Sequence, residues 1–148
     1  MMKISVRMAD ATDREELKDF YSREGFDFED LMTKTPPTFS QSETMYIVAQ
    51  AQDMIVAALR LSIGREPGLG KVGIIQHFEV EDELEETELG PSMLQEAIRI
   101  AEDKGLRALD TVVRADRKDV IQLFKDAKFE VDHKEAHLRR KFRKRVFT

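Results

Sequence analysis

Two side chains that can accept a proton, His77 and Glu79, lie close together in the apolar segment KVGIIQHFEV. Either group could deprotonate an amine, and histidine has the better unperturbed pKa, about 6.5. If the segment is a regular strand, alternation places both side chains on the face opposite Gln76, Phe78 and Val80, unless a bulge intervenes. The alternative to a catalytic histidine is a half-exposed one packed against a helix.

A pair of arginines, Arg114 and Arg117, follows a second apolar segment. The planar guanidinium group matches the geometry of phosphate, so the pair could bind a phosphorylated ligand. The alternative is a pair of solvated charges whose local partners are Asp116 and Asp119.

Charge is strongly segregated in this chain of net charge −5, since residues 79–88 (EVEDELEETE) are almost all acidic and 139–145 (RRKFRKR) almost all basic. The acidic segment is either a solvated loop or a surface that binds a basic protein partner or a cation. It lacks the spacing and the glycine of a calcium-binding loop. The basic segment has no companion motif for nucleic acid, and aromatic residues are few, which argues against that partner. It could instead screen the acidic loop, within one chain or across a homodimer.

Composition excludes several classes of protein. The chain of 148 residues is 41% hydrophobic and 36% charged, which suits one compact domain spanning residues 1–148, with a basic end at 139–148. It has no cysteine, so it has no disulfide or thiol nucleophile, and its three widely spaced histidines predict no metal site. The N-terminal residues do not resemble a signal peptide, and no apolar run reaches the roughly 20 residues of a membrane helix. We therefore expect a cytoplasmic protein.

The elements that must position these residues alternate between strands and helices. Asp10, Thr12 and Asp13 can cap a first helix that ends near Arg23, and Pro91 stands at the expected first position of a later helix that ends at Gly105. Residues 26–32 could form a short helix, followed by a loop at 33–42. Hydrophobic periodicity predicts strands at 2–8, 45–51, 54–63, 71–80, 109–113, 129–131 and 136–142, and helices at 14–23, 91–104 and 116–127.

This order, β-α(-α)-β-β-β-α-β-α-β-β, resembles that of the GNAT N-acetyltransferase superfamily over nearly the whole chain. Val80, Gly90 and the pair Met93-Leu94 fall at the spacing of the family's cofactor motif, a strand valine followed by R-G-x-G-x-G/A and paired leucines. LFKDAKFEV resembles its later L-Y-E-K-x-G-F segment. The resemblance implies an α/β (α+β) fold with a mixed, mostly antiparallel sheet of six to seven strands and about four helices.

The resemblance also implies a reaction, the transfer of an acetyl group from acetyl-CoA to a small or peptidyl amine. Backbone N–H groups at a helix start would bind the pyrophosphate, and the pantetheine arm would add to a free strand edge. His77 and Glu79 are then the candidate catalytic bases. The candidate cofactor-binding residues are Phe78, Val80, Glu88, Leu89, Gly90, Ser92, Arg114, Arg117 and Phe124.

The cofactor motif departs from the family pattern. Its arginine position is Glu85, its first two glycine positions are Glu86 and Glu88, and Pro91 removes an N–H. The position of the family's catalytic tyrosine is Phe124, and a family glycine is replaced by Lys128. Two functions therefore stay open: a divergent N-acetyltransferase with weakened or lost acetyl-CoA binding, and a non-catalytic GNAT-fold module whose acidic loop 79–88 binds a protein partner.

Overall fold

A seven-stranded sheet forms the centre of the fold in the computed structural model, which describes residues 3–26, 40–131 and 137–142. The elements follow one another in the order β1 (Ile4–Met8), η1 (Ala11–Asp13), α1 (Arg14–Arg23), β2 (Ser40–Ala51), β3 (Met54–Glu66), β4 (Gly70–Val80), η2 (Asp82–Leu84), α3 (Leu89–Asp103), β5 (Ala108–Val112), α4 (Lys118–Asp126), β6 (Glu130–Val131) and β7 (His137–Lys141).

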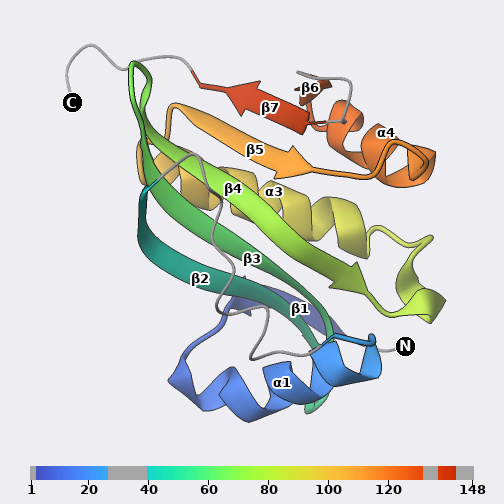
Figure 1. The fold of residues 1–148 in the computed structure, drawn as a ribbon. Coiled ribbons are helices and arrows are strands. Elements are labelled where there is room, and N and C mark those ends of the chain that lie inside the picture. The colour runs from blue at the N-terminus through green and yellow to red at the C-terminus, as the bar shows by residue number, and fades with distance from the viewer. Residues whose placement is uncertain (1–2, 27–39, 132–136, 143–148) are drawn as a thin grey trace.

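The strands are arranged in the order β1-β2-β3-β4-β5-β7-β6 (Figure 1). The β4–β5 pair is parallel, and the other neighbouring pairs are antiparallel. The predicted mixed, mostly antiparallel sheet is thus confirmed. A parallel pair needs a long crossover connection, and here the connection between β4 and β5 contains α3.

Two hydrophobic clusters, one on each face of the sheet, hold the helices in place. On one face the apolar side chains of α1, Leu17, Phe20 and Tyr21, pack on Ile55 and Ala58 of β3. On the other face α3 packs on Ala57, Leu59 and Leu61 of the same strand, because alternate side chains of a strand point to opposite faces, and α4 joins this cluster through Phe124. The fully buried residues of this second cluster include Ala57, Leu59, Leu61, Met93, Leu94 and Leu109.

The predicted capping residues Asp10 and Asp13 hold the turn η1, which leads directly into α1. The Asp10 side chain accepts a hydrogen bond from the Thr12 N–H at 2.9 Å, and Asp13 accepts from the Asp10 N–H at 2.9 Å. Asp13 also receives two hydrogen bonds from the Arg7 guanidinium, at 2.7 and 2.8 Å. The bonds from Arg7 and from the Asp10 backbone lower the pKa of Asp13 from 3.8 to about 2.

We expect Asp13→Asn to lower the free energy of unfolding at neutral pH by about 1–2 kcal/mol, because it removes the ion pair with Arg7. The pKa of Asp13 is lower in the folded state than in the unfolded state. The contribution of ionised Asp13 to the free energy of unfolding is therefore present above pH 3.8 and is lost as the pH falls toward 2. Urea unfolding of both proteins at several pH values measures the effect. A difference between them that stays constant from pH 7 to the acid limit would contradict this account.

Some boundaries differ from the predicted ones. β2 begins at Ser40 rather than near residue 45, because its polar N-terminal residues pair through the backbone with Arg65 and Gly64 of β3. α3 begins at Leu89, so Pro91 is its third residue and not its first. The position still costs no helical hydrogen bond, because the first turn has no intrahelical acceptor for its N–H groups. The short helix predicted at 26–32 and most of the loop at 33–42 lie outside the described residues.

Two residues show how close packing and turn geometry constrain the scaffold. A Cβ atom on Gly73 in β4 would lie 2.8 Å from Leu106 Cδ1, so any larger residue there would require the neighbouring leucine side chains to move. Lys128 has a φ of +71° just after α4. This left-handed conformation is unfavourable for a lysine and favours glycine.

The basic segment does not screen the acidic loop where the structure describes it. Arg139 contacts Asp110 and Glu66 instead, each at 2.8 Å, and Arg140 lies 3.6 Å from Glu102. These arginines lie on β7 and tie it to β5, β3 and α3. Residues 143–148 lie outside the described part of the chain. Within that part, every helix is too short or too polar to cross a membrane.

Candidate active site

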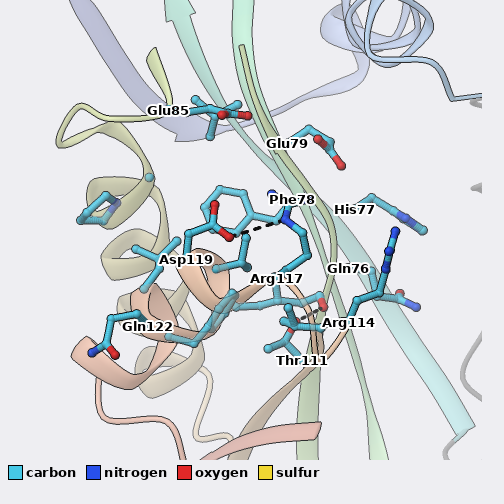
Figure 2. Close-up of a pocket in the computed structure, with 18 of the residues that line it drawn as sticks. Gln76, His77, Phe78, Glu79, Glu85, Thr111, Arg114, Arg117, Asp119 and Gln122 are labelled. Atoms are coloured by element: carbon cyan, nitrogen blue, oxygen red, sulfur yellow. Dashed lines mark hydrogen bonds and ion pairs between the residues drawn. The ribbon is translucent and has the colours of Figure 1, made fainter. Parts of the chain in front are cut away.

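A cleft of about 580 Å³ opens where β4 and β5 diverge. The two strands pair only from Val72↔Ala108 to Ile75↔Thr111, while β4 continues to Val80. The Thr111 hydroxyl donates to the Ile75 carbonyl at 3.1 Å, at the last pair of the ladder. Beyond this point β5 no longer pairs with β4, so the edge of β4 at residues 76–80 borders the cleft. Figure 2 shows this part of β4 with Phe78 on one side and His77 and Glu79 on the other.

A bulge in β4 sets the direction of the candidate bases. Glu79 pairs with Ala58 of β3, but Gln76 pairs with Arg60, so the two residues between them face a single residue of β3. His77 lies in the bulge and has a φ of +52°. Strict alternation was therefore the wrong expectation. Glu79 lies on the same face as Gln76, the α1 face, while Phe78 and Val80 pack toward α3 and α4.

Glu79 has the properties of a general base near neutral pH. Its side chain is half-buried and lines the cleft on the side of β4 away from Phe78 (Figure 2). Burial, together with the nearby carboxylates of Glu24, Glu85 and Asp82, raises its pKa from 4.5 to about 6, and Arg117 opposes this shift. A base with this pKa is mostly ionised at pH 7 yet still binds a proton readily. His77 also lines the cleft and lies beside Glu79.

Glu24 extends the acidic field around Glu79. It lies at the C-terminal end of α1, and its pKa is raised by burial and by the carboxylates of Asp82, Glu81 and Glu85. Segments far apart in the sequence thus bring several negative charges to one side of the cleft. Sequence reasoning did not identify Glu24, because nothing in the segment REGF indicates that it approaches residues 79–85.

The N-terminus of α3 offers few donors to an anion. Pro91 has no N–H, and the N–H of Leu89 donates to the Thr87 hydroxyl at 3.2 Å. Gly90 lines the cleft, but so do the side chains of Glu85 and Glu86, which precede it. A helix N-terminus normally attracts anions, and here acidic side chains oppose that attraction.

Two arginines stand on another wall of the cleft. Arg114 follows β5 and Arg117 immediately precedes α4, and both line the cleft. Each has the local partner that the sequence indicates: Arg114 lies 2.7 Å from Asp116, and Arg117 lies 3.6 Å from Asp119. All four side chains are largely exposed, so these ion pairs are weak and can exchange for a stronger anion.

An aromatic contact forms the floor of the cleft. The rings of Phe78 and Phe124 meet edge to face with centroids 6.2 Å apart, and Phe129 packs on Phe124 at 5.1 Å. Phe124 is buried and carries no hydroxyl, so it cannot donate a proton at this position. The floor therefore provides apolar contact rather than acid catalysis.

The cleft brings together most of the predicted site residues. His77, Glu79, Phe78, Val80, Gly90, Arg114, Arg117 and Phe124 line it. Glu88, Leu89 and Ser92 do not: Leu89 is buried in the core, and the other two are exposed at the start of α3. Within the described ranges, no group of three or more His, Cys, Asp or Glu residues is arranged to hold a metal ion.

Comparison with known proteins identifies the class. The sequence profile of the Acetyltransferase (GNAT) family matches residues 8–129. The chain therefore belongs to the GNAT family of acetyltransferases, and the transferase fold that the resemblance implies is confirmed. No curated protein matches the sequence closely enough to serve as a relative.

Solved structures show the same fold at low sequence identity. The acetyltransferase of GNAT family from Streptococcus pneumoniae aligns with a TM-score of 0.75 and 16% identity, covering 95% of this chain and 100% of that one. Arabidopsis thaliana Naa50, in complex with the bisubstrate analogue CoA-Ac-MVNAL, aligns with a TM-score of 0.72 and 12% identity, covering 94% of this chain and 99% of that one. The PaiA N-acetyltransferase from Thermoplasma acidophilum, in complex with coenzyme A, aligns with a TM-score of 0.67 and 15% identity, covering 95% of this chain and 100% of that one.

Proposed function

We propose that this protein is an N-acetyltransferase that takes the acetyl group from acetyl-CoA and passes it to an amine. The observation that carries the proposal is the position of Glu79, which the β4 bulge places on the wall of the cleft with its pKa raised to about 6. The solved structures of similar fold support it, because two of them hold coenzyme A or a bisubstrate analogue of it.

The residues of the cleft fit one part of acetyl-CoA better than the other. The free edge of β4 and the apolar floor of Phe78 and Phe124 suit the pantetheine arm, whose amides can bond to a strand edge. The pyrophosphate would meet Glu85 and Glu86 near α3. We assign the phosphate contacts instead to Arg114 and Arg117 on the opposite wall, with the N–H of Gly90 as a further donor.

Acetyl-CoA supplies the acetyl group as a thioester, and the protein must remove a proton from the amine. Amines are mostly protonated at pH 7, so the base must accept a proton before or during attack. Glu79 performs this step in our proposal, and it passes the proton on to solvent afterwards. Phe124 cannot protonate the departing thiolate, which therefore takes its proton from water, and we expect turnover to be slow.

The charge around Glu79 favours a cationic acceptor. Glu24, Asp82 and Glu85 lie near enough to Glu79 to raise its pKa, and the same field attracts a protonated amine to the cleft. A small amine and a peptidyl amine both satisfy this requirement.

We expect calorimetry to detect acetyl-CoA binding with a Kd below about 1 mM, both at low salt and at about 0.15 M salt. S-acetylpantetheine, which lacks the pyrophosphate and adenosine, serves as the matched ligand. Because the acidic loop opposes the phosphates, we expect the two ligands to differ in affinity by no more than about tenfold, or about 1.4 kcal/mol.

The same titration distinguishes the two functions that the sequence leaves open. If neither ligand binds at millimolar concentration at either salt, the acetyltransferase proposal fails. The non-catalytic module that binds a protein partner through residues 79–88 would then be the better account. If both ligands bind, release of free thiol in the presence of an amine measures the transfer itself.

A further inference from the structure

Tyr21 of α1 makes a direct contact with the β4 bulge. Its hydroxyl donates a hydrogen bond of 2.7 Å to the carbonyl oxygen of His77. The side chain is completely buried, and its ring has edge contacts with Phe20, Phe26 and Tyr46 at 5.4–6.2 Å. Burial also raises the pKa of Tyr21 well above its usual value, so the hydroxyl remains a donor. The ring contacts therefore hold a hydrogen-bond donor at a fixed point beneath the bulge.

The bulge needs such support. His77 has a φ of +52°, which is unfavourable for any residue with a Cβ atom. A regular strand would avoid this strain by pairing one residue of β4 with each residue of β3. Such pairing shifts the register by one residue and turns every later side chain to the opposite face. Glu79 would then point toward the apolar cluster beneath α3, where Phe78 and Val80 now pack.

We propose that Tyr21 is a positioning residue, which holds Glu79 on the α1 face of β4 by fixing the carbonyl group of the bulge. The role rests on the proposed acetyltransferase function, since Tyr21 acts through Glu79 and does not itself touch the substrate. Neither the resemblance to the family nor the spacing of the motifs assigns this positioning role to Tyr21.

The first test uses the unliganded protein and does not depend on activity. The variant Tyr21→Phe keeps the ring and its packing but removes the hydroxyl. Ile55→Val is the matched control, because it removes one methylene from the same buried cluster and leaves the hydrogen bond to the bulge intact. Carbon-detected NMR follows the titration of the Glu79 carboxyl group in each protein.

We expect Glu79 to titrate near pH 6 in the wild type and in Ile55→Val, and at a higher pH in Tyr21→Phe. If the bulge relaxes, Glu79 turns toward the apolar cluster beneath α3, where desolvation of the carboxylate raises its pKa further. Unchanged titration of Glu79 in a folded Tyr21→Phe protein overturns the proposal. An equal shift of the Glu79 pKa in Ile55→Val overturns the proposal as well, because loosened packing alone would then explain the shift.

The second test is a double-mutant cycle on acetyl transfer. We expect Tyr21→Phe to lower kcat about tenfold when Glu79 is present, because small displacements of a catalytic group slow proton transfer strongly. In the Glu79→Gln background the same substitution should change kcat by less than about twofold, since no carboxylate remains to be positioned. Equal losses in both backgrounds show a general structural role and overturn the proposal.

The two tests also separate this proposal from the proposed function. If the wild type transfers no acetyl group to any amine, the acetyltransferase assignment fails. The titration of Glu79 in the unliganded protein still decides whether Tyr21 positions it.

Discussion

Glu79→Gln is expected to lower kcat/KM for acetyl transfer by about 10²- to 10⁴-fold, the usual contribution of a positioned general base. Glutamine has the same size as glutamate and can remain on the same face of β4, but it cannot accept a proton. The substitution should leave the affinity for acetyl-CoA nearly unchanged, because Glu79 lies on the side of β4 away from the apolar floor of the cleft.

The pH profile gives this prediction its sharpest form. Glu79 must be ionised to act, so we expect kcat/KM of the wild type to rise with pH through about 6, where the carboxyl group titrates. The residual activity of Glu79→Gln should lack that rise. Initial rates measured from pH 5 to pH 9 provide both curves.

His77→Asn distinguishes the two candidate bases. Asparagine tolerates a left-handed φ better than most residues, so this variant removes the imidazole while retaining the bulge. We expect its activity to fall by less than about fivefold, far less than a lost general base would cause. If His77→Asn loses most of the activity and Glu79→Gln retains it, His77 is the base and our assignment is wrong.

Glu85→Arg is expected to tighten the binding of acetyl-CoA by about tenfold at low salt. The substitution places a cation on the wall of the cleft, and it replaces repulsion of the phosphates with attraction. Because residue 85 is exposed, salt should reduce the gain substantially at about 0.15 M. Calorimetry at the two salt concentrations measures the change in Kd.

Two controls show whether this effect is local. Glu83→Arg makes the same change of charge in the same acidic segment, at an exposed residue that does not line the cleft, and it should have a much smaller effect on acetyl-CoA. S-acetylpantetheine has no phosphate, so its affinity should be the same for Glu85→Arg and the wild type. If Glu83→Arg tightens binding as much as Glu85→Arg, net charge is the cause and the position of Glu85 is unimportant.

The order of elements was predictable because it depends on local patterns. The capping residues Asp10 and Asp13 and the helices at 14–23 and 91–104 follow from residue type and helical spacing, and the structure has a capped turn, α1 and α3 at these places. Boundaries were less predictable. β2 extends back to Ser40 through backbone pairing with β3, and hydrogen bonds between backbone groups leave no pattern in the side chains.

The candidate site was predictable only in part. The resemblance to the family implied one site for His77, Phe78, Gly90 and the two arginines, and these residues line one cleft. The proximity of Glu24 to Glu79 and the hydrogen bond from Tyr21 to the bulge were not predicted, since both join α1 to β4 across more than fifty positions of the chain. Such contacts depend on how helix and sheet pack, and local periodicity carries no information about them.

The sequence by itself therefore determined the scaffold and the unusual chemistry of its loop. Local propensity, apolar periodicity and residue identity were sufficient for this, including the acidic side chains of Glu85 and Glu86 and the missing N–H of Pro91. Only the tertiary structure decided which face of β4 carries Glu79. That choice depends on a single extra residue at His77 and on the register between β3 and β4, and a shift of one residue reverses the direction of every later side chain.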